Sequence, residues 1–291
     1  MTEHALTAPV ATPRHVDIRG ASLRAVYIIW YRDVLRFTRD RMRLVVSFAQ
    51  PLLYLLIFGT GLSSSLRGAT GAFSASGLQY QQFIFPGVIG MTVLFTSIFG
   101  SMSIVWDREF GFLKEVLVAP INRAAVAVGK TLGGATQATF QGIIMLAFAP
   151  LVGVKLSFVG VLELLPLIFV LAFALSALGV ALAARMRSLQ GFQVVMNFLM
   201  MPIFFLSGAL FPLSGLPAWM TALTRIDPAS YGIDPLRRVA LGSGGAPASV
   251  LDRLGLSVFG QTLAIWTEEA LLIGFGLAML GVAIRSFRHR D

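Results

Sequence analysis

The stretch VLELLPLIFVLAFALSALGVALAA, residues 161–184, contains a single charged side chain, that of Glu163. A helix rises about 1.5 Å per residue, so this stretch is long enough to cross a hydrocarbon core of roughly 30 Å. Similar apolar runs recur along the 291 residues, of which 56% are hydrophobic and only 13% are charged. Soluble domains carry about a quarter charged residues. The sequence therefore predicts an all-α polytopic membrane protein and argues against an ordinary soluble enzyme.

Six transmembrane helices are predicted from these runs. Prolines interrupt three of them, Pro51 in the first, Pro86 in the second and Pro202 in the fifth. Near the start of the sixth, Glu268 and Glu269 leave two possibilities: a short span, or carboxylates at the outer headgroup level, which we favour. The predicted spans cover about 44–62, 83–105, 131–154, 161–184, 192–211 and 264–284.

The segments around the spans predict how the chain is oriented. Residues 1–21 and 285–291 are expected to be tails, the first of them disordered. Residues 22–43 form an amphipathic pattern, with Leu23, Tyr27 and Trp30 on one side and arginines on the other, which suits an anionic membrane surface. With the N-terminus inside, 17 of the 23 Lys and Arg residues fall on inner segments. We therefore expect both termini to be cytoplasmic.

Two connections are too long to be simple turns. The inner segment 106–130 alternates charged and apolar residues at helical spacing up to Pro120. The outer segment 212–263 is proline-rich but keeps apolar stretches, so short helices that dip into the outer leaflet are expected there. Asp227 and Asp234 are seven residues apart, but Pro228 and Pro235 are expected to prevent one continuous helix between them.

The residue types exclude most catalytic chemistry. The chain has no Cys, and its three His residues all lie near the termini, which argues against thiol, histidine and Fe–S sites. The end of a phosphate loop, Gly129-Lys130-Thr131, lacks the upstream Gly because Ala124 occupies that position. We expect no catalytic residue, metal site or cofactor in this chain, and the positive charge is explained by topology without a nucleic-acid partner.

Polar residues inside the spans remain open to two interpretations. Gln137 and Gln141 share a face of the third span, and Asn197 lies in the fifth. They could form hydrogen bonds between helices or line part of a substrate path. At the start of the third span, Lys130 is expected to be an interfacial anchor, and the Gly129 and Gly133 pair is expected to serve packing.

Three stretches resemble the ABC-2 family of ABC-exporter permeases, in particular its daunorubicin-type drug-exporter branch. The first is Phe85-Pro86-Gly87. The second is similar to the family segment R-E-x-G-T-L-E-x-L…P…G-K, with Phe112 and Lys114 in place of Thr and Glu. The third is similar to the outer motifs F-P-x-S-x-L-P and N-P-x-x-Y-x-x-D-x-x-R, with Asp227 in place of Asn. The resemblance extends over about 22–284, which would be one transmembrane domain.

The resemblance implies how such a chain would be driven. Residues 22–43 would be the interface helix, although a simple membrane anchor is the alternative. The inner segment would contain a coupling helix that docks into a separate ATPase pair, and that pair would bind the ATP and Mg²⁺. The implied coupling residues are Arg108, Glu109, Gly111, Phe112, Leu113, Glu115 and Pro120.

The resemblance also implies an outer cap and a substrate class. Short re-entrant helices would close the path on the outer side, with Arg237 pairing with Asp234 or Asp227. Two permease subunits, identical or paralogous, would carry an amphipathic drug or lipid-like molecule out across a prokaryotic cell membrane, as in multidrug efflux and antibiotic resistance. Polysaccharide or glycolipid export, ion-driven transport and an intramembrane lipid-modifying enzyme are the alternatives. The outer-motif residues are Pro212, Pro217, Asp227, Pro228, Tyr231, Asp234 and Arg237.

Overall fold

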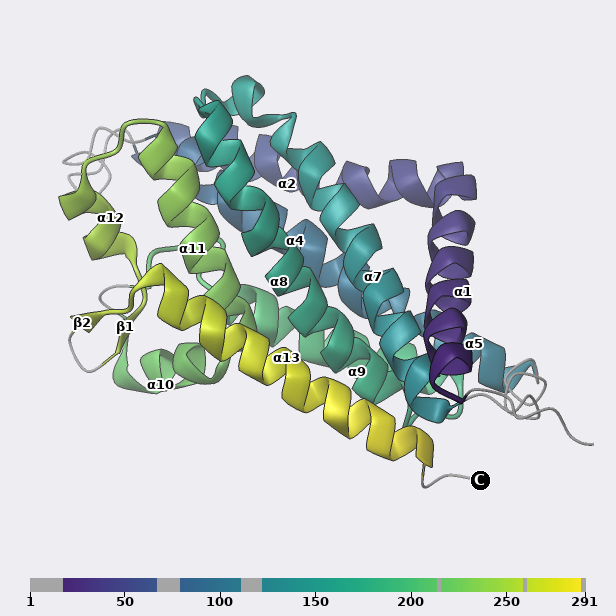
Figure 1. Cartoon of the computed structure of the whole chain (residues 1–291). Helices are drawn as coiled ribbons and strands as arrows, with labels where there is room; N and C mark the ends of the chain where they lie inside the picture. The colour runs from purple at the N-terminus through teal and green to yellow at the C-terminus, as the bar shows by residue number, and fades with distance from the viewer. Residues whose placement is uncertain (1–17, 67–78, 111–121, 214–215, 259–260, 289–291) are drawn as a thin grey trace, which may run out of the picture.

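Four long helices form the centre of the molecule. The computed structural model describes residues 18–66, 79–110, 122–213, 216–258 and 261–288. Within these residues α4 (Tyr80–Gly100), α7 (Arg123–Leu146), α8 (Phe158–Ala183) and α13 (Ile265–Arg288) pack side by side (Figure 1). Nearly all of α4 is buried by its neighbours. The prediction of an all-α polytopic membrane protein is confirmed.

Apolar side chains also cover much of the outer surface of this bundle. On α8, for example, Phe158, Val159 and Leu162 are exposed. Such a surface suits a lipid environment. Each helix makes its backbone hydrogen bonds within itself, so its apolar side chains can face lipid. Five helical segments are long and apolar enough to cross a membrane: Leu44–Gly61, Tyr80–Glu109, Phe158–Ala183, Leu189–Leu206 and Ile265–Phe287.

The predicted third span is the one that these five omit. It corresponds to α7, which begins at Arg123, eight residues before the predicted start, and ends at Leu146. A short 3₁₀ turn, η1 (Ala149–Val152), and Gly153 in the left-handed conformation follow it. Because Arg, Lys, Gly, Thr and Gln occupy much of α7, its mean hydropathy is low, yet it packs between α1, α4 and α8. The count of six spans therefore stays a prediction.

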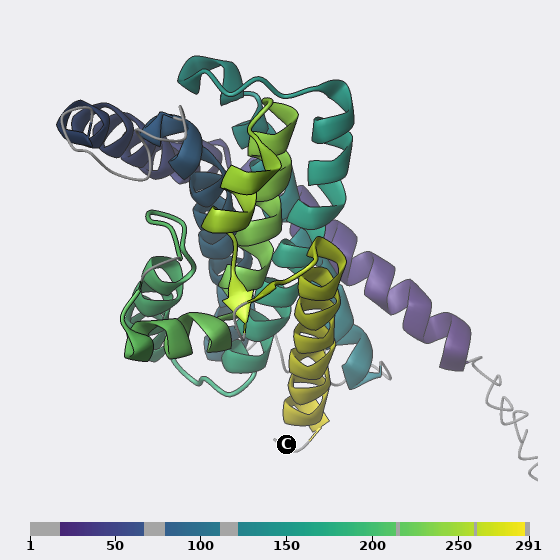
Figure 2. The ribbon, with the colours of Figure 1, turned by 90° about the vertical axis from the view of Figure 1, so that its left-hand side faces the viewer.

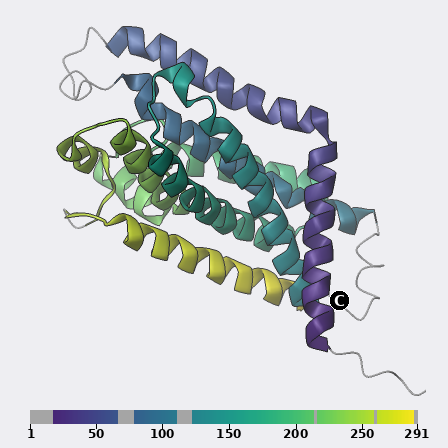
Figure 3. The same ribbon diagram turned by 45° about the horizontal axis from the view of Figure 1, so that its top comes forward.

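One end of the bundle is crossed by the N-terminal helix. α1 (Ile18–Arg39) packs along α7, and α2 (Arg41–Leu66) turns sharply away from it after Asp40 (Figure 3). The C-terminal end of α13 and α5 (Met102–Glu109) lie at this same end of the molecule (Figure 1). On α1, Leu23 and Tyr27 of the predicted apolar side are exposed, while Ala25, Ile29 and Asp33 are buried; the placement of this helix on the membrane surface stays a prediction.

The opposite end is built from the long connection between α9 (Leu189–Leu206) and α13. It contains α10 (Ala218–Ile226), α11 (Pro228–Ser243) and α12 (Ala248–Leu254). A two-stranded antiparallel hairpin, β1 (Ser257–Val258) and β2 (Gln261–Thr262), follows them. Figure 2 looks onto this end. The helices α10, α11 and α12 agree with the expectation of short helices in this connection. Of these, α11 packs against α4, α8 and α13.

Two details of this region differ from the prediction. The fifth span ends at Leu206 and not at 211, because Gly208 adopts a left-handed conformation that ends the helix. α11 is also continuous from Pro228 through Pro235, contrary to our expectation. Pro228 is the first helical residue, a position whose N–H would make no hydrogen bond within the helix. Pro235 is buried, and the packing of neighbouring helices around it keeps α11 helical.

Candidate functional site

A group of charged residues, buried except for the half-exposed Arg32, joins α1, α5 and α7. The Lys130 Nζ atom donates to Asp33 Oδ1 at 3.2 Å, to Asp107 Oδ2 at 3.2 Å and to Ser103 Oγ at 3.0 Å. Arg32 Nη2 donates to the same Asp107 oxygen at 3.3 Å. We call these residues the Lys130 cluster: Arg32, Asp33, Ser103, Asp107 and Lys130. Two cations face two carboxylates, so the charges of the cluster balance.

The surrounding backbone explains why these charges can meet. A Cβ atom on Gly129 would lie 2.9 Å from the Cβ of Ile29, and one on Gly133 would lie 3.1 Å from the Cβ of Asp33. Glycine at both positions therefore lets α1 approach α7 closely, as we expected of this pair. The Lys130 side chain is only 3% exposed. Our prediction that it would be an interfacial anchor is wrong, because the amine reaches inward to Asp33 and Asp107 and not outward.

The last two residues of α5 form hydrogen bonds with the connection between α8 and α9. Arg108 Nη1 donates to the carbonyl oxygens of Ala184 and Met186, at 2.9 and 2.7 Å. Glu109 Oε2 accepts the backbone N–H of Leu189 at 2.7 Å, at the first residue of α9. A carboxylate is favourable there because the first N–H groups of a helix lack partners within it. Both residues thus hold α5 against the α8–α9 connection.

These contacts hold the helix that precedes residues 110–122, the part of the inner segment 106–130 that lies between α5 and α7 in the sequence. α5 ends at Glu109 on one side of it, and on the other side Asn122 caps α7, its side chain accepting the N–H of Ala124 at 3.0 Å. Of the predicted coupling residues, Arg108 and Glu109 bind within the chain. The others lie outside the described residues: Gly111, Phe112, Leu113, Glu115 and Pro120.

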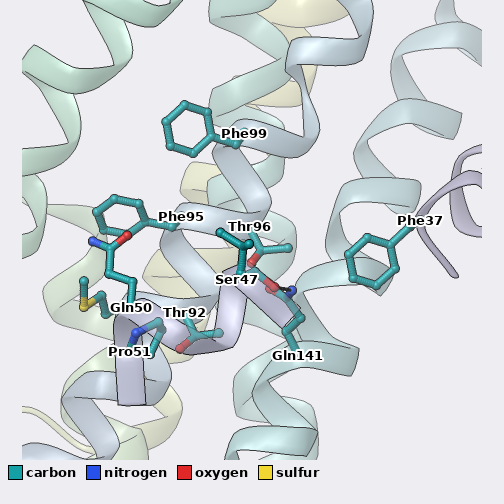
Figure 4. A pocket seen from close by; sticks show the side chains of 11 residues that line it. Phe37, Ser47, Gln50, Pro51, Thr92, Phe95, Thr96, Phe99 and Gln141 are labelled. Atoms are coloured by element: carbon teal, nitrogen blue, oxygen red, sulfur yellow. Dashed lines mark hydrogen bonds between the residues drawn. The ribbon is translucent and has the colours of Figure 1, made fainter. Parts of the chain in front are cut away.

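A cavity of about 230 Å³ opens between α2, α4 and α7. Phe95 and Phe99 on α4 lie on one side of it and Phe37 of α1 on another, and Gln50 projects near Phe95 (Figure 4). Gln141 lines the cavity and bonds to Thr96 and Ser47 through its amide group. None of the described residues that line it is charged. The lining residues are Phe37, Val46, Ser47, Gln50, Pro51, Met91, Thr92, Phe95, Thr96, Phe99 and Gln141.

The three predicted path residues do not come together at this cavity. Gln137 is buried outside it and donates to the backbone oxygen of Asp33 at 3.1 Å, so it serves a contact between helices. Asn197 is exposed on α9. Gln141 alone of the three lines the cavity, and it too forms hydrogen bonds between helices.

The outer motif is organised around Arg238, which we did not predict. Its Nε donates to Asp234 Oδ2 at 2.9 Å, and its Nη2 bonds to both Asp234 and Glu268. Glu268 is completely buried within the protein, and its placement at the outer headgroup level stays a prediction. The i, i+4 spacing of Asp234 and Arg238 on a helix was the available signal.

Arg237 has different partners from those we expected. It forms no ion pair with Asp234 or Asp227 in the described residues; its guanidinium lies 4.2 Å from the centre of the Phe83 ring and donates to the Gly208 carbonyl. Arg237 packs on Phe83 of α4, while Asp234 bonds to Arg238 on the following turn of α11.

The other outer-motif residues have local roles. Asp227 caps α11 by accepting the N–H of Ala229 at 3.0 Å, and Pro228 is the first residue of that helix. Tyr231 donates its hydroxyl to the Arg225 carbonyl at 2.7 Å. Pro217 precedes α10 as its capping residue, and Pro212 is half-buried in the turn that follows Gly208.

Comparison of the sequence with known proteins agrees with the resemblance described above. The family model described as ABC-2 type transporter matches residues 24–241. The inner membrane transport permease YadH of Escherichia coli is 27% identical over 90% of this chain and 97% of its own length. Nodulation protein J of Rhizobium meliloti is 26% identical over 74% of this chain and 80% of its own. "Probable multidrug ABC transporter permease YbhR" of Escherichia coli is 30% identical over 56% of this chain and 45% of its own. The chain therefore belongs to the family of ABC-2 type transporters.

Proposed function

We propose that this chain is the permease subunit of an exporter driven by ATP that a separate ATPase pair hydrolyses. The observation that carries the proposal is the position of α5. It is bonded to α1 and α7 through Asp107 and to the α8–α9 connection through Arg108 and Glu109. A displacement of the segment that follows α5 would reach several helices at once. The ATP and Mg²⁺ would be held by the partner, and both termini would face it in the cytoplasm.

The cavity supports an amphipathic drug or lipid-like molecule as the substrate class. Its walls combine phenylalanine rings with uncharged polar groups from Gln50 and Gln141, a lining that favours largely apolar ligands with a few hydrogen-bonding groups. The multidrug name of the relative YbhR points the same way. Two permease chains, identical or paralogous, would form the path. Export of a polysaccharide or glycolipid is the alternative within the same family.

Recovery of the ATPase on a tagged permease tests this proposal. Scrambling residues 112–120, which leaves Arg108 and Glu109 in place, should reduce recovery by at least about tenfold, since interface anchors are each worth about 2 kcal/mol or more. Scrambling 68–77, in the connection between α2 and α4, is the matched control and should leave recovery unchanged. Equal recovery of the ATPase with both scrambled chains would contradict the proposal.

A further inference from the structure

The Lys130 cluster connects α1 to α5 and α7, the two helices that flank residues 110–122 in the sequence. Asp107 on α5 and Lys130 on α7 lie near the two ends of the inner segment 106–130, and Asp33 lies on α1. We propose that Lys130 is a positioning residue that holds α1, α5 and α7 together as one rigid unit, so that motion at the segment moves all three. The inference rests on the proposed function and goes beyond it by naming the unit that moves.

The ammonium group is fully used by this arrangement. A lysine side chain has three N–H donors, and Asp33, Ser103 and Asp107 supply three acceptors on two different helices. The side chains of Lys130, Asp33 and Asp107 are 3%, 8% and 9% exposed. Sliding one helix past another would leave a buried charge without its partner, which is costly. Apolar contacts alone would tolerate such sliding far better.

Two further hydrogen bonds join α1 to the part of α7 that follows Lys130. Trp30 Nε1 donates to Thr136 Oγ1 at 3.0 Å, and Gln137 Nε2 donates to the Asp33 carbonyl at 3.1 Å. The close approach at Gly129 and Gly133 holds the two backbones together over the same length. The relative position of α1 and α7 is therefore set by directional bonds as well as by shape.

Distances between spin labels test whether α1 and α7, two helices of the proposed unit, move as one. The chain has no cysteine, so labels can be placed at exposed Tyr31 on α1, Ile143 on α7 and Leu277 on α13. In the full complex with its ATPase, the 31–143 distance should be the same with and without ATP and vanadate. The 31–277 distance should change. A nucleotide-dependent change in the 31–143 distance as large as that in the 31–277 distance would overturn the proposal.

Variants separate a positioning role from a purely structural one. Lys130→Met leaves buried Asp33 without a cation and Asp107 with Arg32 alone, so it should reduce folding and membrane insertion, whereas Lys130→Arg should retain both. The double variant Lys130→Met/Asp33→Asn keeps the Arg32–Asp107 pair, so its charges balance and insertion should recover. In this double variant the 31–143 distance distribution should nevertheless be broader than in the parent chain. Lys155→Met, at an exposed lysine in a loop, is the matched control and should change nothing.

The outcomes distinguish this inference from the function on which it rests. If no labelled distance responds to nucleotide although the ATPase is bound, the proposed coupling to ATP fails. The double variant without nucleotide still decides the role of Lys130. A 31–143 distribution as narrow as that of the parent chain would show that the ion pairs do not hold α1 on α7.

Discussion

At the scale of single residues, the outer region depends on one arginine that bonds to two buried acids. Arg238 bonds to Asp234 and to Glu268, and it also donates to the Leu263 carbonyl. The Asp234 and Glu268 side chains are 1% and 0% exposed, respectively. Arg238 therefore links α11 to the first turn of α13 and to Leu263, which lies between β2 and α13.

Removing Arg238 should destabilise the folded chain strongly. Arg238→Met leaves two buried carboxylates without their cation, and breaking such a buried pair costs about 3–5 kcal/mol. The melting temperature of the purified chain in detergent should fall sharply, and cleavage by protease between α11 and α13 should become faster. Arg187→Met, at an exposed arginine, is the control, with an expected effect within about ±0.5 kcal/mol. An equal melting temperature for the two variants would contradict this assignment.

The buried carboxylates whose partners the sequence did not identify share one property. Asp33, Asp107 and Glu268 acquire their partners from helices far away along the chain. A single sequence gives the face of a helix on which a residue lies, but not the helix that packs on that face. Lys130 and Arg237 could be located by spacing and motif, whereas their contacts depended on the tertiary arrangement.

At the scale of the elements, hydropathy was a good guide to the apolar helices and a poor one to α7. The segments α2, α8 and α13 overlap the predicted spans closely because lipid-spanning length and apolar composition are local properties. α7 is defined by its packing, and its Gly, Thr and Gln residues make contacts that no window of hydropathy detects. The continuity of α11 through Pro235 likewise depends on its burial by neighbouring helices.

Packing of the turn after α9 onto α4 depends on a glycine. A Cβ atom on Gly87 would overlap the Ala209 carbonyl and would lie 2.7 Å from the Ala209 Cα. Gly87→Ala should therefore displace backbone and cost about 1–3 kcal/mol, the usual penalty for overpacking. At Gly281 of α13 a Cβ would meet no described atom within 4 Å, so Gly281→Ala should be neutral or slightly stabilising. Thermal unfolding of the two variants measures the difference, and a neutral Gly87→Ala would exclude the close approach.

At the scale of the whole molecule, the two ends of the bundle differ in their chemistry. One end has α1, α5, the α8–α9 connection and the end of α13, joined by bonds such as Arg123 to the Phe287 carbonyl and Arg185 to Ser286. The other end has the α10–α12 region and the hairpin (Figures 1 and 2). The excess of basic residues at the first end predicts that it faces the cytoplasm.

Cysteine labelling in intact cells would test this orientation directly. Ser249 on α12 and Arg187 between α8 and α9 are both exposed and lie at opposite ends of the bundle. This chain has no cysteine of its own. Ser249→Cys should react with a membrane-impermeant maleimide in cells whose cell membrane is intact and whose outer envelope layers have been permeabilised. Arg187→Cys should react only after lysis. The reverse pattern would place the α10–α12 region in the cytoplasm. The segment after α5 would then face away from any cytoplasmic ATPase, and the coupling proposed for α5 would have no physical basis.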